Sequence, residues 1–215
     1  SKIHEILESG DFLTLGKYCN EFEKEFASYT NSKYAVAVSS GTSSLEIILR
    51  ALSIQGYDVI VPTNTFAATA YAVVHAGGRP VFTDIAPDMN FDLVDVKRRI
   101  TSRTKAIIPV HIGGLISQSM PELLELAEQH GLYVVEDAAH AHGSALKNKK
   151  AGSFGVAGSF SFFSTKVITS GEGGMITTDN TEIAEKARLL RDQGKVRGNL
   201  VGVLGYNWRM TEFHA

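Results

Sequence analysis

Short apolar runs alternate along the chain with longer segments in which apolar residues recur every three or four positions. The runs at 34–38 and 58–61 are nearly continuous, which is typical of strands that are covered on both faces. Residues 45–52 place their isoleucines and leucines at helical spacing. Helices are predicted over residues 2–8, 21–29, 45–52, 65–75, 94–100, 120–130 and 181–190. Strands are predicted over residues 34–38, 58–61, 80–83, 106–110, 132–135, 158–163 and 174–178.

This alternation of strands and helices predicts an α/β fold, a three-layer α/β/α sandwich around a mostly parallel mixed sheet. No internal repeat or low-complexity stretch interrupts it. Two parts are expected: an N-terminal helical segment at residues 1–30 and a large domain at residues 31–215. Residues 207–215 are expected to be a turn that enters a further helix.

Composition narrows the class of protein. The chain has 215 residues, 44% of them hydrophobic, with 21 basic and 23 acidic side chains for a net charge of −2. That content is enough for one substantial core, and no basic tract suggests a nucleic-acid partner. Cys19 is the single cysteine, so no disulfide framework is expected. With no signal peptide and no apolar run of membrane-spanning length, we expect a cytoplasmic protein without a membrane partner.

One lysine stands in a setting that suits chemistry. Lys166 follows the strand-like run Ser159–Phe163 and precedes the glycine cluster Gly171–Gly174. Most lysines at the start of a loop are solvated surface residues, but the flanking sequence here is apolar and rich in glycine. A desolvated amine has a lowered pKa, so it can be neutral and form a Schiff base. Lys166 is therefore predicted to be catalytic.

A carboxylate, Asp137, comes two residues after the predicted strand 132–135. An aspartate in that position is, by itself, most often a turn residue. A Schiff-base lysine and a carboxylate that faces a pyridinium nitrogen are, however, the two groups that pyridoxal phosphate requires of a protein. Together, Lys166 and Asp137 predict pyridoxal 5'-phosphate as the cofactor.

The loop Ser39–Ser44 joins a predicted strand to a predicted helix. Gly41 allows a tight turn, the hydroxyl of Thr42 adds a donor, and the helix N-terminus offers free N–H groups and a positive dipole end. These features predict a phosphate cradle. For the segment taken alone, an ordinary helix cap is the commoner interpretation.

Aromatic and histidine side chains follow the other strand ends. Phe66 opens a helix and could stack on a planar ring, although a core position is commoner for such a phenylalanine. His140, three residues after Asp137, is placed to reach a ring substituent, and His142 is expected to be structural. Since the two histidines have no third ligand at metal spacing, no metal site is predicted.

Taken in order, these elements resemble the DegT/DnrJ/EryC1/StrS aminotransferase family over essentially the whole chain. The segments that carry the resemblance are Gly10–Lys17, Phe22-Glu23, Gly41-Thr42, Thr65-Phe66, Val110-His111, Glu136–Gly143, Ser161-Phe162, Lys166, Gly171–Gly174 and Gly205–Met210. The ordered series is far more specific than any one member.

The resemblance implies a fold-type-I enzyme with the large domain of the aspartate aminotransferase-like fold. Lys166 then matches the lysine that binds the cofactor, and Asp137 the partner of the pyridine nitrogen. His140 stands where many members have glutamine beside the ring hydroxyl. The resemblance also implies that Gly41, Thr42 and Ser161 contact the cofactor phosphate. It implies that Phe66 stacks on the face of the ring. Asn207 would reach the phosphate bound in the neighbouring subunit.

The implied activity is transamination of a keto-sugar nucleotide with an amino donor such as glutamate, in a homodimer with the site at its interface. Family members continue beyond residue 215, so this chain is expected to lack a small C-terminal domain. Open alternatives are an incomplete chain or regulator that binds the cofactor without turnover, and an aminotransferase for a cyclitol or other ketone. Related dehydratases carry histidine at this position, so the presence of Lys166 disfavours a dehydratase activity. A plain nucleotide-binding module lacks support because no Gly-x-Gly-x-x-Gly run follows the first strand.

Overall fold

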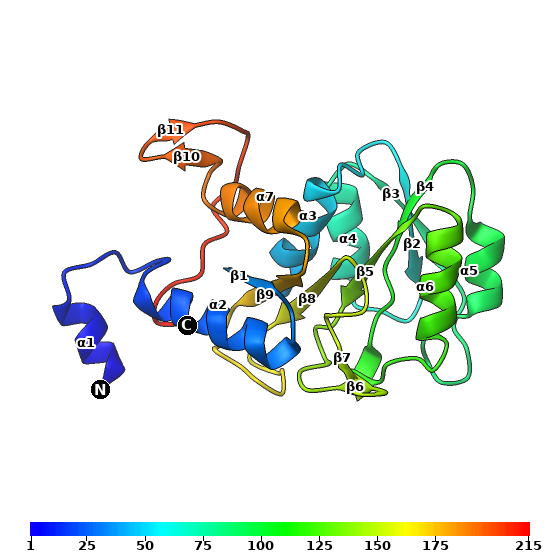
Figure 1. Cartoon of the computed structure of the whole chain (residues 1–215), viewed down its shortest axis with the longest axis horizontal. Helices are drawn as coiled ribbons and strands as arrows, with labels where there is room; N and C mark the ends of the chain where they lie inside the picture. The colour runs from blue at the N-terminus through cyan, green and yellow to red at the C-terminus, as the bar shows by residue number, and fades with distance from the viewer.

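A seven-stranded sheet forms the centre of the molecule in the order β1-β9-β8-β5-β4-β2-β3 (Figure 1). The computed structural model describes the whole chain, Ser1–Ala215. β9 is antiparallel to both of its neighbours and every other pair of adjacent strands is parallel, which confirms the predicted mixed sheet. The strands are β1 (Tyr34–Val38), β2 (Asp58–Pro62), β3 (Arg79–Thr83), β4 (Thr104–Ile107), β5 (Tyr133–Asp137), β8 (Ala157–Ser161) and β9 (Gly174–Thr178).

Helices cover both faces of this sheet, because alternate side chains of each strand feed two separate apolar cores. Along β1, Val36 belongs to the core that contains α3, whereas Ala37 belongs to the core that contains α2. The predicted three-layer α/β/α sandwich is therefore confirmed. The first face carries α3 (Gly41–Ala51), α4 (Ala67–His75) and α7 (Thr181–Arg191), and the second carries α2 (Lys17–Thr30), α5 (Leu93–Arg99) and α6 (Met120–Gln129).

Smaller elements lie outside the three layers. A short helix, α1 (Lys2–Glu8), and the hairpin of β10 (Lys195–Arg197) and β11 (Leu200–Val201) project from the same end of the molecule (Figure 1). A second hairpin pairs β6 (Ala145–Leu146) with β7 (Lys149–Lys150). Neither hairpin was predicted, because strands of two or three residues are too short to show a period.

Helix starts depart most from the predicted boundaries. α3 begins at Gly41 instead of residue 45 because Ser40 and Ser43 form a capping box ahead of the first apolar residue. α2 begins at Lys17 instead of residue 21, and its cap comes from Glu212 at the other end of the chain. α2 packs on the sheet through Phe26. The division of the chain at residue 30 stays a prediction.

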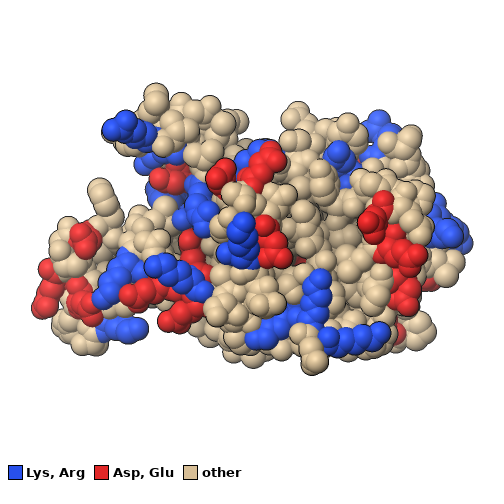
Figure 2. All heavy atoms as spheres, viewed as in Figure 1, with Lys and Arg blue, Asp and Glu red and all other residues tan.

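On the face shown in Figure 2, basic and acidic side chains are interspersed, and no field of one sign covers it. This agrees with the near balance of charge in the sequence. None of the helices combines the length and the apolar character that crossing a bilayer requires. Residues 212–214 form a turn, in which the His214 and Ala215 N–H groups donate to the carbonyl of Thr211.

Candidate active site

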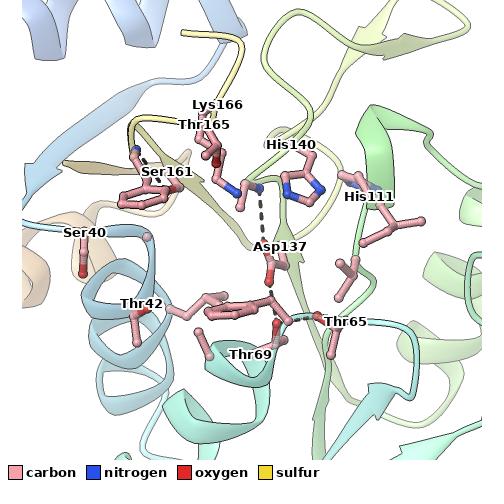
Figure 3. Close-up of a pocket in the computed structure, with 18 of the residues that line it drawn as sticks. Ser40, Thr42, Thr65, Thr69, His111, Asp137, His140, Ser161, Thr165 and Lys166 are labelled. Atoms are coloured by element: carbon pink, nitrogen blue, oxygen red, sulfur yellow. Dashed lines mark hydrogen bonds between the residues drawn. The ribbon is translucent and has the colours of Figure 1, made fainter. Parts of the chain in front are cut away.

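The parallel strands deliver their carboxyl ends to one edge of the sheet, and a cavity of about 660 Å³ opens there (Figure 3). This edge is where open α/β sheets bind ligands, since loops and helix N-termini converge on it. The predicted site residues that line the cavity are Gly41, Thr42, Phe66, Asp137, His140, Ser161 and Lys166. Asn207, the remaining one, does not line it.

Asp137 is the buried acid of this cavity. It ends β5, and its side chain is held by two donors: Thr69 Oγ1 donates to Oδ2 at 2.7 Å and the Ala139 N–H donates to Oδ1 at 3.2 Å. Each carboxylate oxygen keeps acceptor capacity for a further donor, because a carboxylate offers about four acceptor sites. The fold thus places an oriented carboxylate inside the cavity.

Lys166 lies in a turn beyond the end of β8, where its N–H donates to the Phe163 carbonyl at 2.9 Å. Burial lowers the pKa of the Lys166 amine below its usual value near 10.5, and the charge of Asp137 partly opposes this shift. The two groups reach one cavity from different strands. A lysine with a lowered pKa beside a buried carboxylate is suited to forming covalent bonds and moving protons.

The N-terminus of α3 meets the end of β8 at one side of the cavity. In the capping box, the Ser40 N–H donates to Ser43 Oγ at 3.0 Å and the Ser43 N–H donates to Ser40 Oγ at 3.1 Å. The N–H groups of Gly41 and Thr42 have no such partner and stay free for a ligand. A Cβ on Gly41 would come within 2.8 Å of the Ser161 Cβ, so only glycine fits at this approach. The segment is therefore a helix cap that also lines the cavity, and its role as a phosphate cradle stays a prediction.

Two ring side chains complete the lining. Phe66 is the N-cap residue of α4 and is 78% exposed, so its ring is available to a ligand instead of being packed in the core. Nδ1 of His140 accepts from the Gly113 N–H at 3.3 Å, which leaves the proton of the neutral ring on Nε2. Burial and the charge of Lys166 lower the pKa of His140, against the opposing charge of Asp137.

A second buried acid, Glu136, lies next to Asp137 and forms a hydrogen-bond network beside the cavity. Glu136 accepts N–H bonds from Gly152, Phe154 and Gly155 at 2.6–2.9 Å, and its Oε2 lies 2.9 Å from Nε2 of His111. Both partners are almost fully buried. His111 also lines the cavity, so this network connects the end of β5 to a cavity wall.

Sequence reasoning missed Thr69 as a site residue. It lies four residues after Thr65, and both hydroxyls reach the cavity wall from the start of α4. That i, i+4 spacing was the available signal, but it becomes informative only once α4 is known to pack beside Asp137.

The described chain contains no group of three or more His, Cys, Asp or Glu side chains that could hold a metal ion. His142 is buried between the rings of Phe160 and Phe162, and neither of its ring nitrogens has a hydrogen-bond partner. It does not line the cavity.

The fold is a three-layer α/β/α domain with a cavity at the carboxyl ends of its parallel strands. A model described as the DegT/DnrJ/EryC1/StrS aminotransferase family matches residues 1–215, and the chain belongs to this family.

Individual relatives agree with this assignment. GDP-perosamine synthase of Caulobacter vibrioides is 44% identical over 215 residues, which cover 98% of this chain and 58% of the relative. The chain therefore spans little more than half of that protein. Among solved structures, DesV of Streptomyces venezuelae has a TM-score of 0.94 at 38% identity, covering 99% of this chain and 57% of DesV. PseC of Helicobacter pylori, an aminotransferase in pseudoaminic acid biosynthesis, has a TM-score of 0.92 at 33% identity, covering 99% and 58%.

Proposed function

We propose that this chain is the large domain of a pyridoxal-phosphate-dependent aminotransferase that moves an amino group from an amino acid such as glutamate to a keto-sugar nucleotide. Membership of the aminotransferase family supports the reaction class. The name of the perosamine synthase relative supports a nucleotide-linked sugar as the acceptor. The observation that carries the proposal is that Lys166 and Asp137, from separate strands, line one cavity.

The cavity residues fit the cofactor group by group. The free N–H groups of Gly41 and Thr42, with the hydroxyls of Thr42 and Ser161, suit a phosphate at a helix N-terminus. The exposed ring of Phe66 suits a planar heterocycle, and the carboxylate of Asp137 suits a protonated ring nitrogen. His140 also lines the cavity, and its Nε2–H is suited to donate to an oxygen on the cofactor ring.

When bound, pyridoxal phosphate supplies an electron-withdrawing ring that stabilises the negative charge left when a substrate carbon loses its proton. The protein supplies the rest. Lys166 would hold the cofactor covalently, and its amine, whose pKa is lowered by burial, is suited to carrying the substrate proton. The carboxylate of Asp137 would face the ring nitrogen and accept a hydrogen bond from its N–H.

The first experiment asks whether the cofactor is bound at Lys166. We expect the purified chain to develop a visible absorption band with pyridoxal phosphate, and borohydride to fix the cofactor to the peptide that contains Lys166. The variant Lys166→Ala should lose the fixation, whereas Lys97→Ala, a change on the exposed face of α5, should keep it. A wild-type chain that stays colourless and unlabelled would contradict the proposal.

A second experiment separates turnover from binding alone. Glutamate added to the loaded protein should change its visible spectrum, because the donor half of the reaction needs no sugar. A protein that binds the cofactor but responds to no amino acid would be a binding protein or an incomplete enzyme. Keto-sugar nucleotides and cyclitol ketones, tested as acceptors on the aminated protein, would then distinguish the substrate classes.

The proposal extends to a homodimer in which Asn207 contacts the cofactor phosphate of the neighbouring subunit. The Asn207 side chain is exposed and has no hydrogen bond within its own chain, although its neighbours are firmly held. An uncommitted amide in such a position is suited to a contact outside its own subunit.

A further inference from the structure

Two threonines beside Asp137 have no part in the chemistry proposed above. Thr69 Oγ1 lies 2.7 Å from Asp137 Oδ2, and Thr65 Oγ1 lies 2.6 Å from Thr69 Oγ1 (Figure 3). Thr69 is 1% exposed, and both threonines belong to the cavity wall. The three side chains form one continuous line of hydrogen bonds from α4 to the end of β5.

The chemistry of the acceptor fixes the direction of this line. Thr69 Oγ1 donates to Oδ2 of Asp137, so its single hydroxyl proton points at the carboxylate. Thr69 can then only accept from Thr65, which must donate. Each hydroxyl polarises the next, and such chains are stronger than their separate bonds.

Helix capping does not account for these hydroxyls. The N-cap residue of α4 is Phe66, and α4 has no side-chain cap although Thr65 directly precedes it. A threonine at a helix start usually bonds a free backbone N–H of the first turn. The Thr65 and Thr69 hydroxyls instead bond only to each other and to Asp137.

We infer that Thr65 and Thr69 are positioning residues that hold the Asp137 carboxylate in the plane needed to meet a protonated ring nitrogen. The inference rests on the proposed function. Thr69 holds Oδ2 and the Ala139 N–H holds Oδ1, so the carboxylate cannot rotate freely. The charged or titratable groups that face it are Lys166 and His140. Since Phe66 belongs to the same turn, the start of α4 would supply both the stacking ring and the orienting hydroxyls.

The test compares cofactor affinity across a set of near-isosteric variants of the full chain, measured by titration with pyridoxal phosphate. Thr69→Val should weaken binding about tenfold or more, because it removes a bond to a charged group. Thr69→Ser should keep most of the affinity. Thr65→Val should cause a smaller loss, and the double variant should bind about as well as Thr69→Val, because Thr65 acts only through Thr69.

Thr177→Val is the matched control. The buried Thr177 hydroxyl donates to the Gly152 carbonyl at 2.7 Å, outside the cavity. Its loss should lower stability in urea without changing cofactor affinity. If Thr69→Val lowers stability but binds the cofactor like wild type, the inference is overturned and the proposed function stands. If the losses of cofactor affinity in Thr65→Val and Thr69→Val simply add in the double variant, the inference that Thr65 acts through Thr69 is overturned. A wild-type chain that binds no pyridoxal phosphate would overturn the proposed function and this inference with it.

Discussion

At the scale of single residues, His142 shows how the fold treats a buried titratable group. Its ring lies between Phe160 and Phe162, with centroids 5.4 and 5.5 Å away, and makes no hydrogen bond. Burial lowers the pKa of His142 to about 4, and the charges of Lys166 and His140 act in the same direction. The folded protein therefore keeps this ring neutral at a pH where an unfolded histidine is charged.

This shift predicts a loss of stability in mild acid. Between about pH 6.5 and pH 4 the unfolded chain binds a proton at His142 and the folded chain does not, so stability falls as pH falls. At ~1.4 kcal/mol per pKa unit, the site should cost about 3 kcal/mol across that window. Urea unfolding at several pH values should show a flatter profile for His142→Leu than for wild type.

The control for this series is His130→Gln, because His130 is exposed and should leave the profile unchanged. An unchanged pH slope in His142→Leu would mean that the ring is charged or solvated in the folded protein.

At the scale of elements, the start of α2 depends on a residue far away in the sequence. α2 has Gly16 as its N-cap and no local side-chain cap. The carboxylate of Glu212 supplies one, accepting the N–H groups of Gly16, Tyr18 and Cys19 at 2.7, 2.8 and 3.1 Å. A negative group at a helix N-terminus also interacts favourably with the helix dipole. Glu212 thereby fastens the end of the chain to α2.

Replacing this cap should destabilise the fold. Glu212→Ala leaves three helix N–H groups without their acceptor and should lower the free energy of unfolding by about 2 kcal/mol. Burial raises the pKa of Glu212, but the bonds from Cys19, Tyr18 and Gly16 outweigh it and leave the pKa below 4.5. The contribution is therefore complete above that pH and is lost as pH falls through the lowered pKa.

Urea unfolding at neutral pH measures the effect, with Glu122→Ala as control, since Glu122 lies exposed in the first turn of α6. Equal stability of the two variants would show that Glu212 is not a cap in solution.

These two helix starts show what the sequence could predict and what it could not. The capping box of α3 is local, and the Ser40–Ser43 spacing could have placed its start. The start of α2 depends on Glu212, which no local pattern reveals. The same distinction applies to the site. Because parallel strands end at one edge, Asp137 and Lys166 could be predicted from their places after strands, whereas Thr69 needed the packing of α4 against β5.

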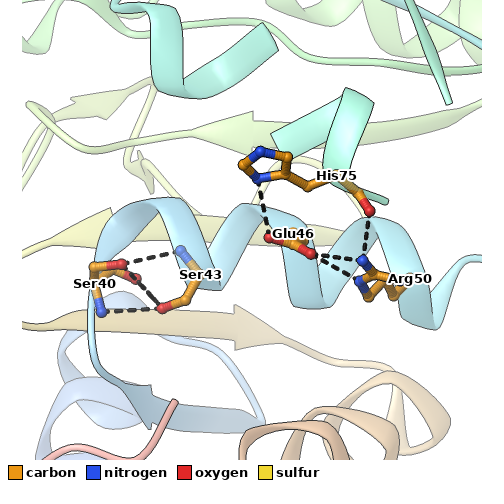
Figure 4. A network of polar contacts seen from close by, with 5 residues as sticks. All are labelled: Ser40, Ser43, Glu46, Arg50 and His75. Carbon is orange, nitrogen blue, oxygen red and sulfur yellow. Dashed lines mark hydrogen bonds and ion pairs between the residues drawn. The ribbon is translucent and has the colours of Figure 1, made fainter. Parts of the chain in front are cut away.

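At the scale of the whole molecule, the two neighbours of Asn207 in the sequence pack against side chains from other elements. The rings of Tyr206 and Trp208 stack with centroids 4.0 Å apart, and the Arg50 guanidinium lies 4.7 Å from the centre of the Tyr206 ring. Arg50 is held in turn by Glu46 through bonds of 2.7 and 2.9 Å, in the network that reaches α4 (Figure 4). In an extended segment alternate side chains point to opposite sides, so Asn207 faces away from this stack.

The proposed contact between subunits predicts complementation between two defective chains. Lys166→Ala lacks the covalent attachment, and Asn207→Ala lacks the phosphate contact but keeps its lysine. If Asn207 acts across the dimer, a hybrid contains one complete site, made of Lys166 from one chain and Asn207 from the other. Co-expressing the two chains with different affinity tags and isolating the hybrid should therefore restore pyridoxal phosphate affinity at one site per dimer. Each variant purified alone is the control. A contact within one subunit gives the opposite result, because every hybrid site would then lack one of the two groups and isolated hybrids would bind no better than Asn207→Ala.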